Sequence, residues 1–130
     1  MGRNKKDDDG LLTPLELELM TVLWKTGGGT VHEVTEALPK DKDYAYTTIS
    51  TVLRMLLAKG VVEATANGRQ HTYVPVMQKD EYESKSIDHM VTTVFDGEPA
   101  SLMRRLLDSR GLSKKELDEI RELLDKGTRR

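Results

Sequence analysis

The sequence predicts a mainly α-helical protein with one small β-hairpin. Three observations support this fold class. Apolar residues recur at helical spacing through most of the chain. At three places a Ser or Thr precedes a Glu by three positions, as in a helix-capping box. In the middle of the chain the pattern changes to that of two strands around Asn67-Gly68, a pair typical of tight hairpin turns.

Two short helices open the expected fold. The first begins at the capping pair of Thr13 and Glu16, with Pro14 at the first helical position, and ends at the glycines 27–29. The second begins at the pair of Thr30 and Glu33 and runs to about Leu38. Residues 1–11 before them are largely a charge run without periodicity, so we expect a disordered arm there.

A third helix is expected from about Ala45 to Lys59, with Gly60 as its terminator. Its inward positions recur at helical spacing: Ile49, Val52, Leu53, Leu56 and Leu57. Strands are expected over residues 61–66 and 69–74, with Asn67 and Gly68 forming a type I′ turn. Three helices followed by a hairpin is the order of a winged helix-turn-helix, which we expect over residues 12–76.

Residues 77–130 predict a C-terminal helical region. Helices are expected over residues 79–95 and 99–108, and a third begins at the capping pair of Ser113 and Glu116. A unit this small buries too little surface to be stable alone, so we expect it to be a dimerisation region. A dimer would also read two half-sites at once. The expected dimer contacts are Ile87, Met90, Val91, Val94, Leu102, Leu106, Leu117, Ile120, Leu123 and Leu124.

Composition excludes several classes of site. The 130 residues are enough for one ordinary domain, or for one small domain with an appendage. The chain has no cysteine, which excludes disulfides, thiolate zinc sites, iron–sulfur clusters and cysteine nucleophiles. The three histidines lack ligand spacing, and no catalytic motif is present, so we expect no metal, no cofactor and no enzyme activity. The N-terminus is polar and no apolar run could span a bilayer, so we expect a cytoplasmic protein without membrane insertion.

The third helix carries chemistry suited to DNA. The whole chain has a net charge of -2, but residues 44–76 hold Arg54, Lys59 and Arg69 against the single acid Glu63. Short hydroxyl side chains can bond phosphates or base edges and let a helix approach the floor of the groove. The expected DNA-facing residues are Tyr46, Thr47, Thr48, Ser50, Thr51 and Arg54. The alternative for Thr47 or Thr48 is that it only caps the helix.

The hairpin would form the wing of this fold. Its tip offers Asn67, Gly68 and Arg69, with His71 as a further candidate. An arginine there can bind a phosphate or enter a minor groove. The alternative is that Arg69 is a solvated turn charge.

Three segments resemble the BlaI/MecI/CopY family of bacterial repressors: LTPLELELMTVLW, YAYTTISTVLRMLLAKGVV and GRQHTYVP. The resemblance extends from about Leu12 to Leu124 and implies a dimeric winged-helix repressor with a C-terminal helical dimerisation region. It also implies that Thr47, Thr48, Ser50 and Thr51 face DNA. One position departs from the family pattern, because Met55 stands where the family usually has Arg, and Arg54 stands one residue earlier.

The family resemblance also bears on the inducing signal. Its copper branch binds metal through a cysteine cluster, which this chain lacks. In the β-lactam branch a membrane sensor-protease signals and the repressor is cut in its C-terminal region. Val94, Phe95 and Asp96 are the candidate cleavage region here, and the alternative is a plain helix-ending turn at Asp96-Gly97.

Together these patterns predict a homodimeric repressor that occupies a two-fold double-stranded DNA operator and is released by proteolysis. Two other functions remain open on the sequence alone. One is a winged-helix module used only for protein contacts. The other is a hydrolase or metal enzyme, for which the sequence offers no clustered polar site.

Overall fold

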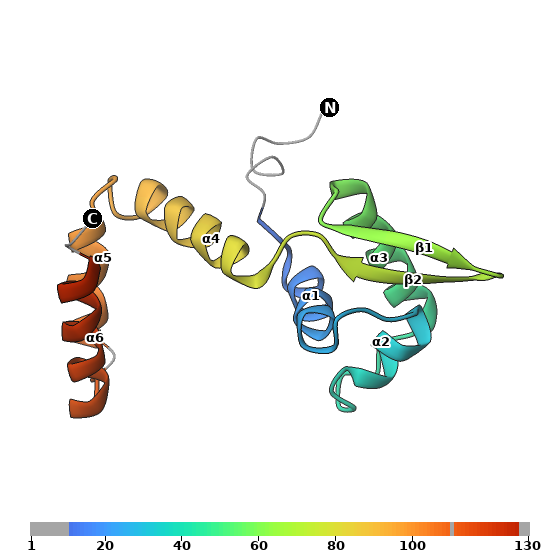
Figure 1. The fold of residues 1–130 in the computed structure, drawn as a ribbon, viewed down its shortest axis with the longest axis horizontal. Coiled ribbons are helices and arrows are strands. Elements are labelled where there is room, and N and C mark those ends of the chain that lie inside the picture. The colour runs from blue at the N-terminus through green and yellow to red at the C-terminus, as the bar shows by residue number, and fades with distance from the viewer. Residues whose placement is uncertain (1–10, 110, 128–130) are drawn as a thin grey trace. The chain divides into compact units, whose positions relative to one another are not determined.

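The computed structural model describes residues 11–109 and 111–127, which contain six helices and one two-stranded sheet (Figure 1). In chain order the elements are α1 (Pro14–Thr26), α2 (Val31–Ala37), α3 (Tyr46–Lys59), β1 (Val62–Asn67), β2 (Gln70–Pro75), α4 (Lys79–Thr93), α5 (Pro99–Ser109) and α6 (Lys114–Gly127). This confirms the predicted fold class. The expected disordered arm, except for Leu11, lies outside the described residues. The chain divides within α4 into two compact units, one ending at Ile87 and the next beginning at Asp88.

The helix starts form as the capping pairs predict. At α1 the Thr13 N–H donates to Glu16 Oε1 at 2.9 Å, and the Glu16 N–H donates to Thr13 Oγ1 at 3.2 Å. The same exchange precedes α2 and α6, from Thr30 with Glu33 and from Ser113 with Glu116. Each box satisfies two backbone N–H groups that a helix start otherwise leaves without an acceptor.

The core of the first unit lies between α1, α2, α3 and the hairpin. Its centre is formed by fully buried side chains of α1 and α3: Leu19, Met20, Leu23, Ile49, Leu53 and Leu56. The prediction that Leu57 also points inward is wrong, because its side chain is 40% exposed. At 100° per residue Leu57 lies about 80° around the helix from Ile49, which places it at the edge of the buried face.

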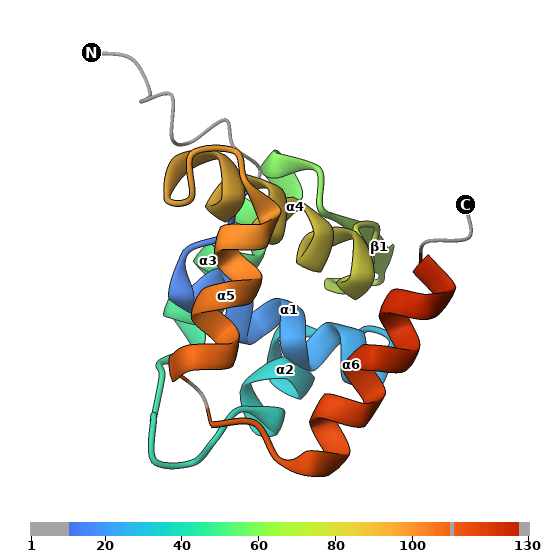
Figure 2. The same ribbon diagram turned by 90° about the vertical axis from the view of Figure 1, so that its left-hand side faces the viewer.

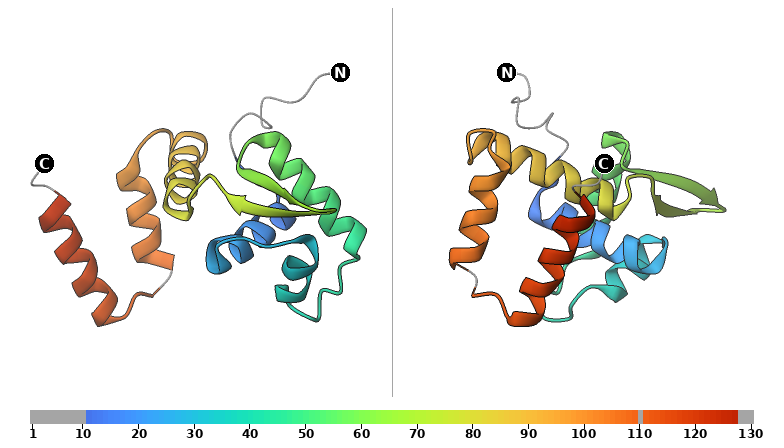
Figure 3. Two further views of the ribbon diagram at one scale, coloured as in Figure 1. Left: turned by 45° about the vertical axis from the view of Figure 1, so that its right-hand side comes forward. Right: turned by 60° about the vertical axis from the view of Figure 1, so that its left-hand side comes forward.

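The hairpin forms with a turn shifted by one residue from the prediction. β1 and β2 pair antiparallel from Val62 opposite Pro75 to Asn67 opposite Gln70, which leaves Gly68 and Arg69 as the turn. Gly68 has a φ of 70° and Arg69 is outside the positive region, the pattern of a type II′ turn rather than type I′. The hairpin tip projects from the helices in Figure 1 and in the right-hand view of Figure 3.

The loop between α1 and α2 is held against the hairpin. Gly29 exchanges two backbone hydrogen bonds with Tyr73, at 2.9 Å and 2.8 Å. The neighbouring Gly28 has a φ of 145°, and a Cβ there would lie 2.7 Å from Val74 Cγ1 and 2.9 Å from the Tyr73 carbonyl oxygen. Only a glycine permits this close approach.

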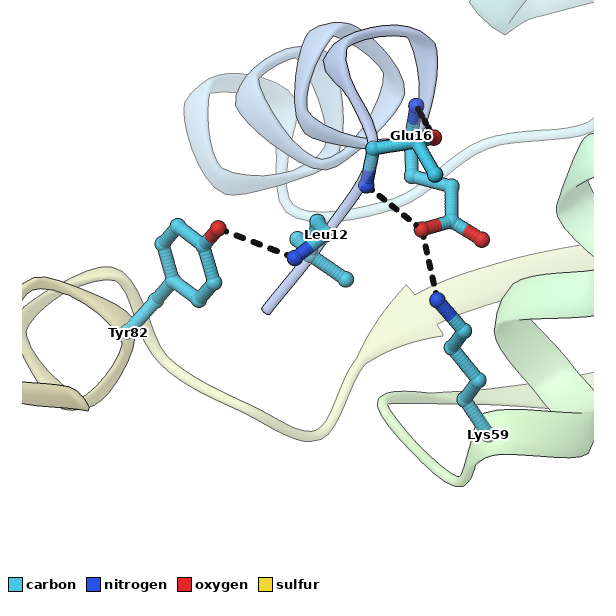
Figure 4. Close-up of polar contacts among 5 residues, drawn as sticks. Leu12, Glu16, Lys59 and Tyr82 are labelled. Carbon is cyan, nitrogen blue, oxygen red and sulfur yellow. Dashed lines mark hydrogen bonds and ion pairs between the residues drawn. The ribbon is translucent and has the colours of Figure 1, made fainter. Parts of the chain in front are cut away.

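Polar contacts join the ends of α1, α3 and α4 within the first unit (Figure 4). Lys59 Nζ lies 2.7 Å from Glu16 Oε1, and Glu16 is only 3% exposed. The Leu12 N–H donates to the Tyr82 hydroxyl at 3.0 Å. The Trp24 indole N–H donates to the Met77 carbonyl at 2.8 Å, and its ring packs against Tyr82. These contacts fix the start of α4 on the first unit.

The second unit contains the end of α4 with α5 and α6, which Figure 2 shows as separate helices. In the turn that follows α4, Asp96 and Gly97 have positive φ values of 54° and 79°. None of the side chains described in residues 88–108 and 111–127 is buried. Across residues 11–109 and 111–127, no helix combines the length and the apolar character needed to span a bilayer.

Candidate nucleic-acid interface

The outer face of α3 is open to solvent because Ile49, Leu53 and Leu56 turn the opposite face into the core. Four of the polar α3 residues predicted to face DNA are exposed: Thr47, Thr48, Thr51 and Arg54. A fifth, Ser50, is half-buried. Tyr46, at the start of the helix, is 57% exposed. Within the described residues, α3 begins after Ala45 without a side-chain cap, so neither Thr47 nor Thr48 serves as the capping residue.

Arg54 lies over the hydroxyls of its own helix. Its Nη1 is 3.5 Å from Ser50 Oγ and its Nη2 is 3.5 Å from Thr51 Oγ1. Both distances are at the outer limit of a hydrogen bond, so these contacts are weak. The guanidinium therefore keeps donors available for an anion that approaches this face.

A groove of about 340 Å³ lies between α2, α3 and the hairpin. Tyr46, Ser50 and Arg54 line it from α3, and Arg69 lines it from the hairpin turn. The structure thus brings four of the seven predicted DNA-facing residues around one groove. The other three, Thr47, Thr48 and Thr51, are exposed on α3 but are not among the lining residues of this groove.

Other residues of the groove were not among the predicted contacts. The polar ones nearest the arginines in the lining include His32, from α2, and Gln70, next to the turn in β2. His71, the additional candidate of the hairpin, lines it as well. No spacing in the sequence relates α2 to the hairpin, because their proximity depends on the Gly29–Tyr73 bridge. Gly29 and Tyr73 are far apart in the sequence, and no local sequence pattern predicts that they pair.

Met55, the departure from the family pattern, lies away from this groove. Its side chain is 52% exposed and lines a separate groove of about 890 Å³ together with Lys59 and Val76. Arg54, one residue earlier, is the α3 arginine that lines the smaller groove. An arginine at position 55 would point elsewhere, since consecutive helical residues are about 100° apart.

The other predicted site residues belong mostly to α4, α5 and α6, and the structure leaves their side chains at the surface. Those with large exposed fractions are Ile87 (48%), Met90 (43%), Val94 (64%), Leu106 (39%), Leu123 (66%) and Leu124 (56%). The remaining ones, half-buried, are Val91, Leu102, Leu117 and Ile120. In the candidate cleavage region, Phe95 is half-buried and Asp96 is exposed. Among the described residues, no group of three His, Asp or Glu side chains could hold a metal ion.

Comparison with known proteins relates most of the chain to repressors. The family model described as "Penicillinase repressor" matches residues 12–126. The penicillinase repressor of Bacillus licheniformis is 27% identical over 114 residues, which cover 88% of this chain and 89% of that protein. The transcriptional regulator BlaI of Mycobacterium tuberculosis is 44% identical over 71 residues, which cover 54% of this chain and 51% of that protein.

Solved structures agree on the fold. The crystal structure of YusO from Bacillus subtilis superimposes with a TM-score of 0.50 at 21% identity, covering 95% of this chain and 78% of that one. At that identity the likeness concerns the fold alone, and it agrees with the winged helix described above. Because the family model spans nearly all of the chain, this protein belongs to the penicillinase repressor family.

Proposed function

We propose that this protein is a DNA-binding transcriptional repressor that occupies a two-fold operator as a homodimer. Its family consists of repressors rather than enzymes. The observation that carries the proposal is the groove beside α3, where the guanidinium groups of Arg54 and Arg69 come from two different elements. Two cations next to a hydroxyl-rich helix face suit a DNA backbone that runs between α3 and the hairpin.

In this proposal α3 enters the major groove. Its outer hydroxyls, on Thr47, Thr48 and Thr51, are short enough to let the helix approach base edges, and Thr methyl groups can contact thymine. Arg54 and Arg69 then bind phosphates on the flank of the groove. Because the threonines of α3 would contact bases while Arg54 and Arg69 contact phosphates, one domain could read the sequence and hold the DNA backbone at the same time.

We infer that the dimer forms through the C-terminal helical region predicted over residues 77–130, which includes the second unit. Support comes from its apolar side chains, of which Val94, Leu123 and Leu124 are more than half exposed. Burial of apolar surface stabilises association by roughly 25 cal/mol per Å². Pairing with a second copy would remove these side chains from water and present two reading helices to two half-sites.

Release by proteolysis is the third part of the proposal. Asp96 is exposed, so a protease could reach the turn that follows α4. A cut there would separate α5 and α6 from the DNA-binding unit while α3 stayed intact. A membrane sensor-protease, as the family resemblance implies, is the partner that would make the cut.

The decisive experiment measures affinity for a duplex enriched from a random library and for a mixed-sequence duplex, at one salt concentration. Thr48→Ala and Thr51→Ala should each weaken the enriched duplex by about 1–3 kcal/mol and the mixed duplex less. Thr21→Ala is the matched control, because Thr21 is exposed on α1 and its hydroxyl bonds only the Leu17 carbonyl of its own helix. A protein that enriches no sequence and shows no salt-dependent DNA affinity would instead be a winged helix for protein contacts.

A further inference from the structure

The groove between α2, α3 and the hairpin contains more basic groups than DNA binding by α3 and the turn requires. Besides Arg54 and Arg69, it is lined by the imidazoles of His32 from α2 and His71 from β2. Both histidines are exposed. Three elements, α2, α3 and the hairpin, therefore contribute four basic side chains to the lining of one space of about 340 Å³.

The charged side chains that line the groove are all basic, and the acid one turn after His32 on α2, Glu36, is paired with Lys40. From α3 the groove receives Tyr46 and Arg54, and from the hairpin it receives Arg69 and Tyr73. No Asp or Glu of the described chain lines it. The nearest carboxylate in sequence, that of Glu33, accepts the Thr30 N–H at 2.9 Å as part of the α2 capping box. An anion is the ligand that this set of donors fits.

We propose that this groove binds one DNA backbone phosphate and that His32 and His71 take up protons when the phosphate enters, so that affinity for DNA increases as the pH falls. This inference rests on the proposed DNA-binding function. Histidine is the side chain whose charge changes between about pH 5 and pH 8. A phosphate oxygen beside an imidazole favours its protonated form, and a ligand that favours protonation binds more tightly at lower pH.

The sign and size of the effect follow from this linkage. Each histidine that gains a proton on binding raises affinity by at most about tenfold for each unit that the pH falls, so the pair gives at most about 100-fold per unit. A phosphate contact carries no base information. The same factor should therefore apply to a mixed-sequence duplex and to the enriched duplex, unlike the effects of Thr48→Ala and Thr51→Ala.

The test uses the intact protein and two duplexes of about 30 base pairs, one enriched and one mixed, titrated from pH 6 to pH 8 at fixed salt. His32→Gln and His71→Gln should each remove part of the pH dependence, and the double variant should remove nearly all of it. His89→Gln, which changes a histidine of the second unit, should keep the full dependence.

The outcomes separate the two proposals. If operator binding is specific but its pH dependence is absent, or survives in the double variant, the histidine inference is overturned while the repressor function stands. A pH effect confined to the enriched duplex would mean that the histidines contact bases, and the phosphate assignment would be wrong. Absence of DNA binding at every pH would overturn the proposed function and this inference together.

Discussion

The ion pair between Glu16 and Lys59 should contribute far more to stability than its distance alone suggests. The Glu16 side chain is 4% exposed and that of Lys59 is 36% exposed, with 2.7 Å between Oε1 and Nζ. A hydrogen bond to a charged group contributes about 1.5–3 kcal/mol net. Because Lys59 remains partly hydrated, we expect a coupling energy near the lower end, about 1.5 kcal/mol.

A double-mutant cycle with Glu16→Gln and Lys59→Met measures this coupling. Glutamine keeps an oxygen for the Thr13 N–H, so the capping contact is retained and the ionic part is isolated. Of the two single changes, Lys59→Met should be the more damaging. It should lower the free energy of unfolding by about 2–3 kcal/mol, because it leaves a buried carboxylate without its cation. Urea unfolding at one protein concentration, followed by the fluorescence of Trp24, reports on the first unit, since Trp24 is the chain's single tryptophan.

The chain offers a matched control on α4. Lys79 Nζ lies 2.8 Å from Glu83 Oε2, nearly the same distance, but the two side chains are 61% and 60% exposed. The cycle with Lys79→Met and Glu83→Gln should give only about 0.3–0.5 kcal/mol. Equal coupling energies for the two pairs would show that burial does not set the strength of the Glu16–Lys59 contact, and the reasoning would fail.

Three further predictions concern the hairpin and the assembly. Gly28→Ala should lower the free energy of unfolding by about 2–3 kcal/mol in urea titrations, whereas Gly27→Ala, with open space at its Cβ, should cost about 1 kcal/mol. Arg69→Ala should reduce the salt slope of DNA affinity by about one unit on any duplex; an unchanged slope would place Arg69 away from DNA. Ile120→Asp, and a fragment ending at Val94, should sediment as monomers and lose about 100-fold or more in operator affinity. If both stay dimeric and bind normally, the dimer contact lies elsewhere and cleavage is not the switch.

The parts of the fold set by local chemistry could be predicted from the sequence. The capping boxes at Thr13, Thr30 and Ser113 involve residues three apart, so their hydrogen bonds follow from the sequence pattern alone. The hairpin was also predicted, but its turn lies one residue later. Asn67-Gly68 favours a type I′ turn, and the cross-strand register set by Val62 opposite Pro75 places Gly68 first in the turn instead.

The composition of the groove could not be predicted, because it depends on contacts between distant segments. The hydroxyl face of α3 follows from helical spacing, so its exposed threonines were identified. His32 was missed because only the packing of α2 against α3 and β2 brings it to Arg54 and Arg69. Leu57 was assigned to the core because periodicity gives a helix face but not the width of its buried part. The assignment of dimer contacts stays a prediction.

The three consecutive glycines 27–29 have a consequence for protein engineering. Such a run has the composition of a flexible linker and would be a natural choice for inserting a tag or joining a second domain. Here the two hydrogen bonds of Gly29 to Tyr73 and the close approach of Gly28 to Val74 fix the backbone on both sides of any insertion. Added residues would separate α2 from the hairpin. The exposed stretch 39–43, between α2 and α3, is the place where this unit should tolerate an insertion.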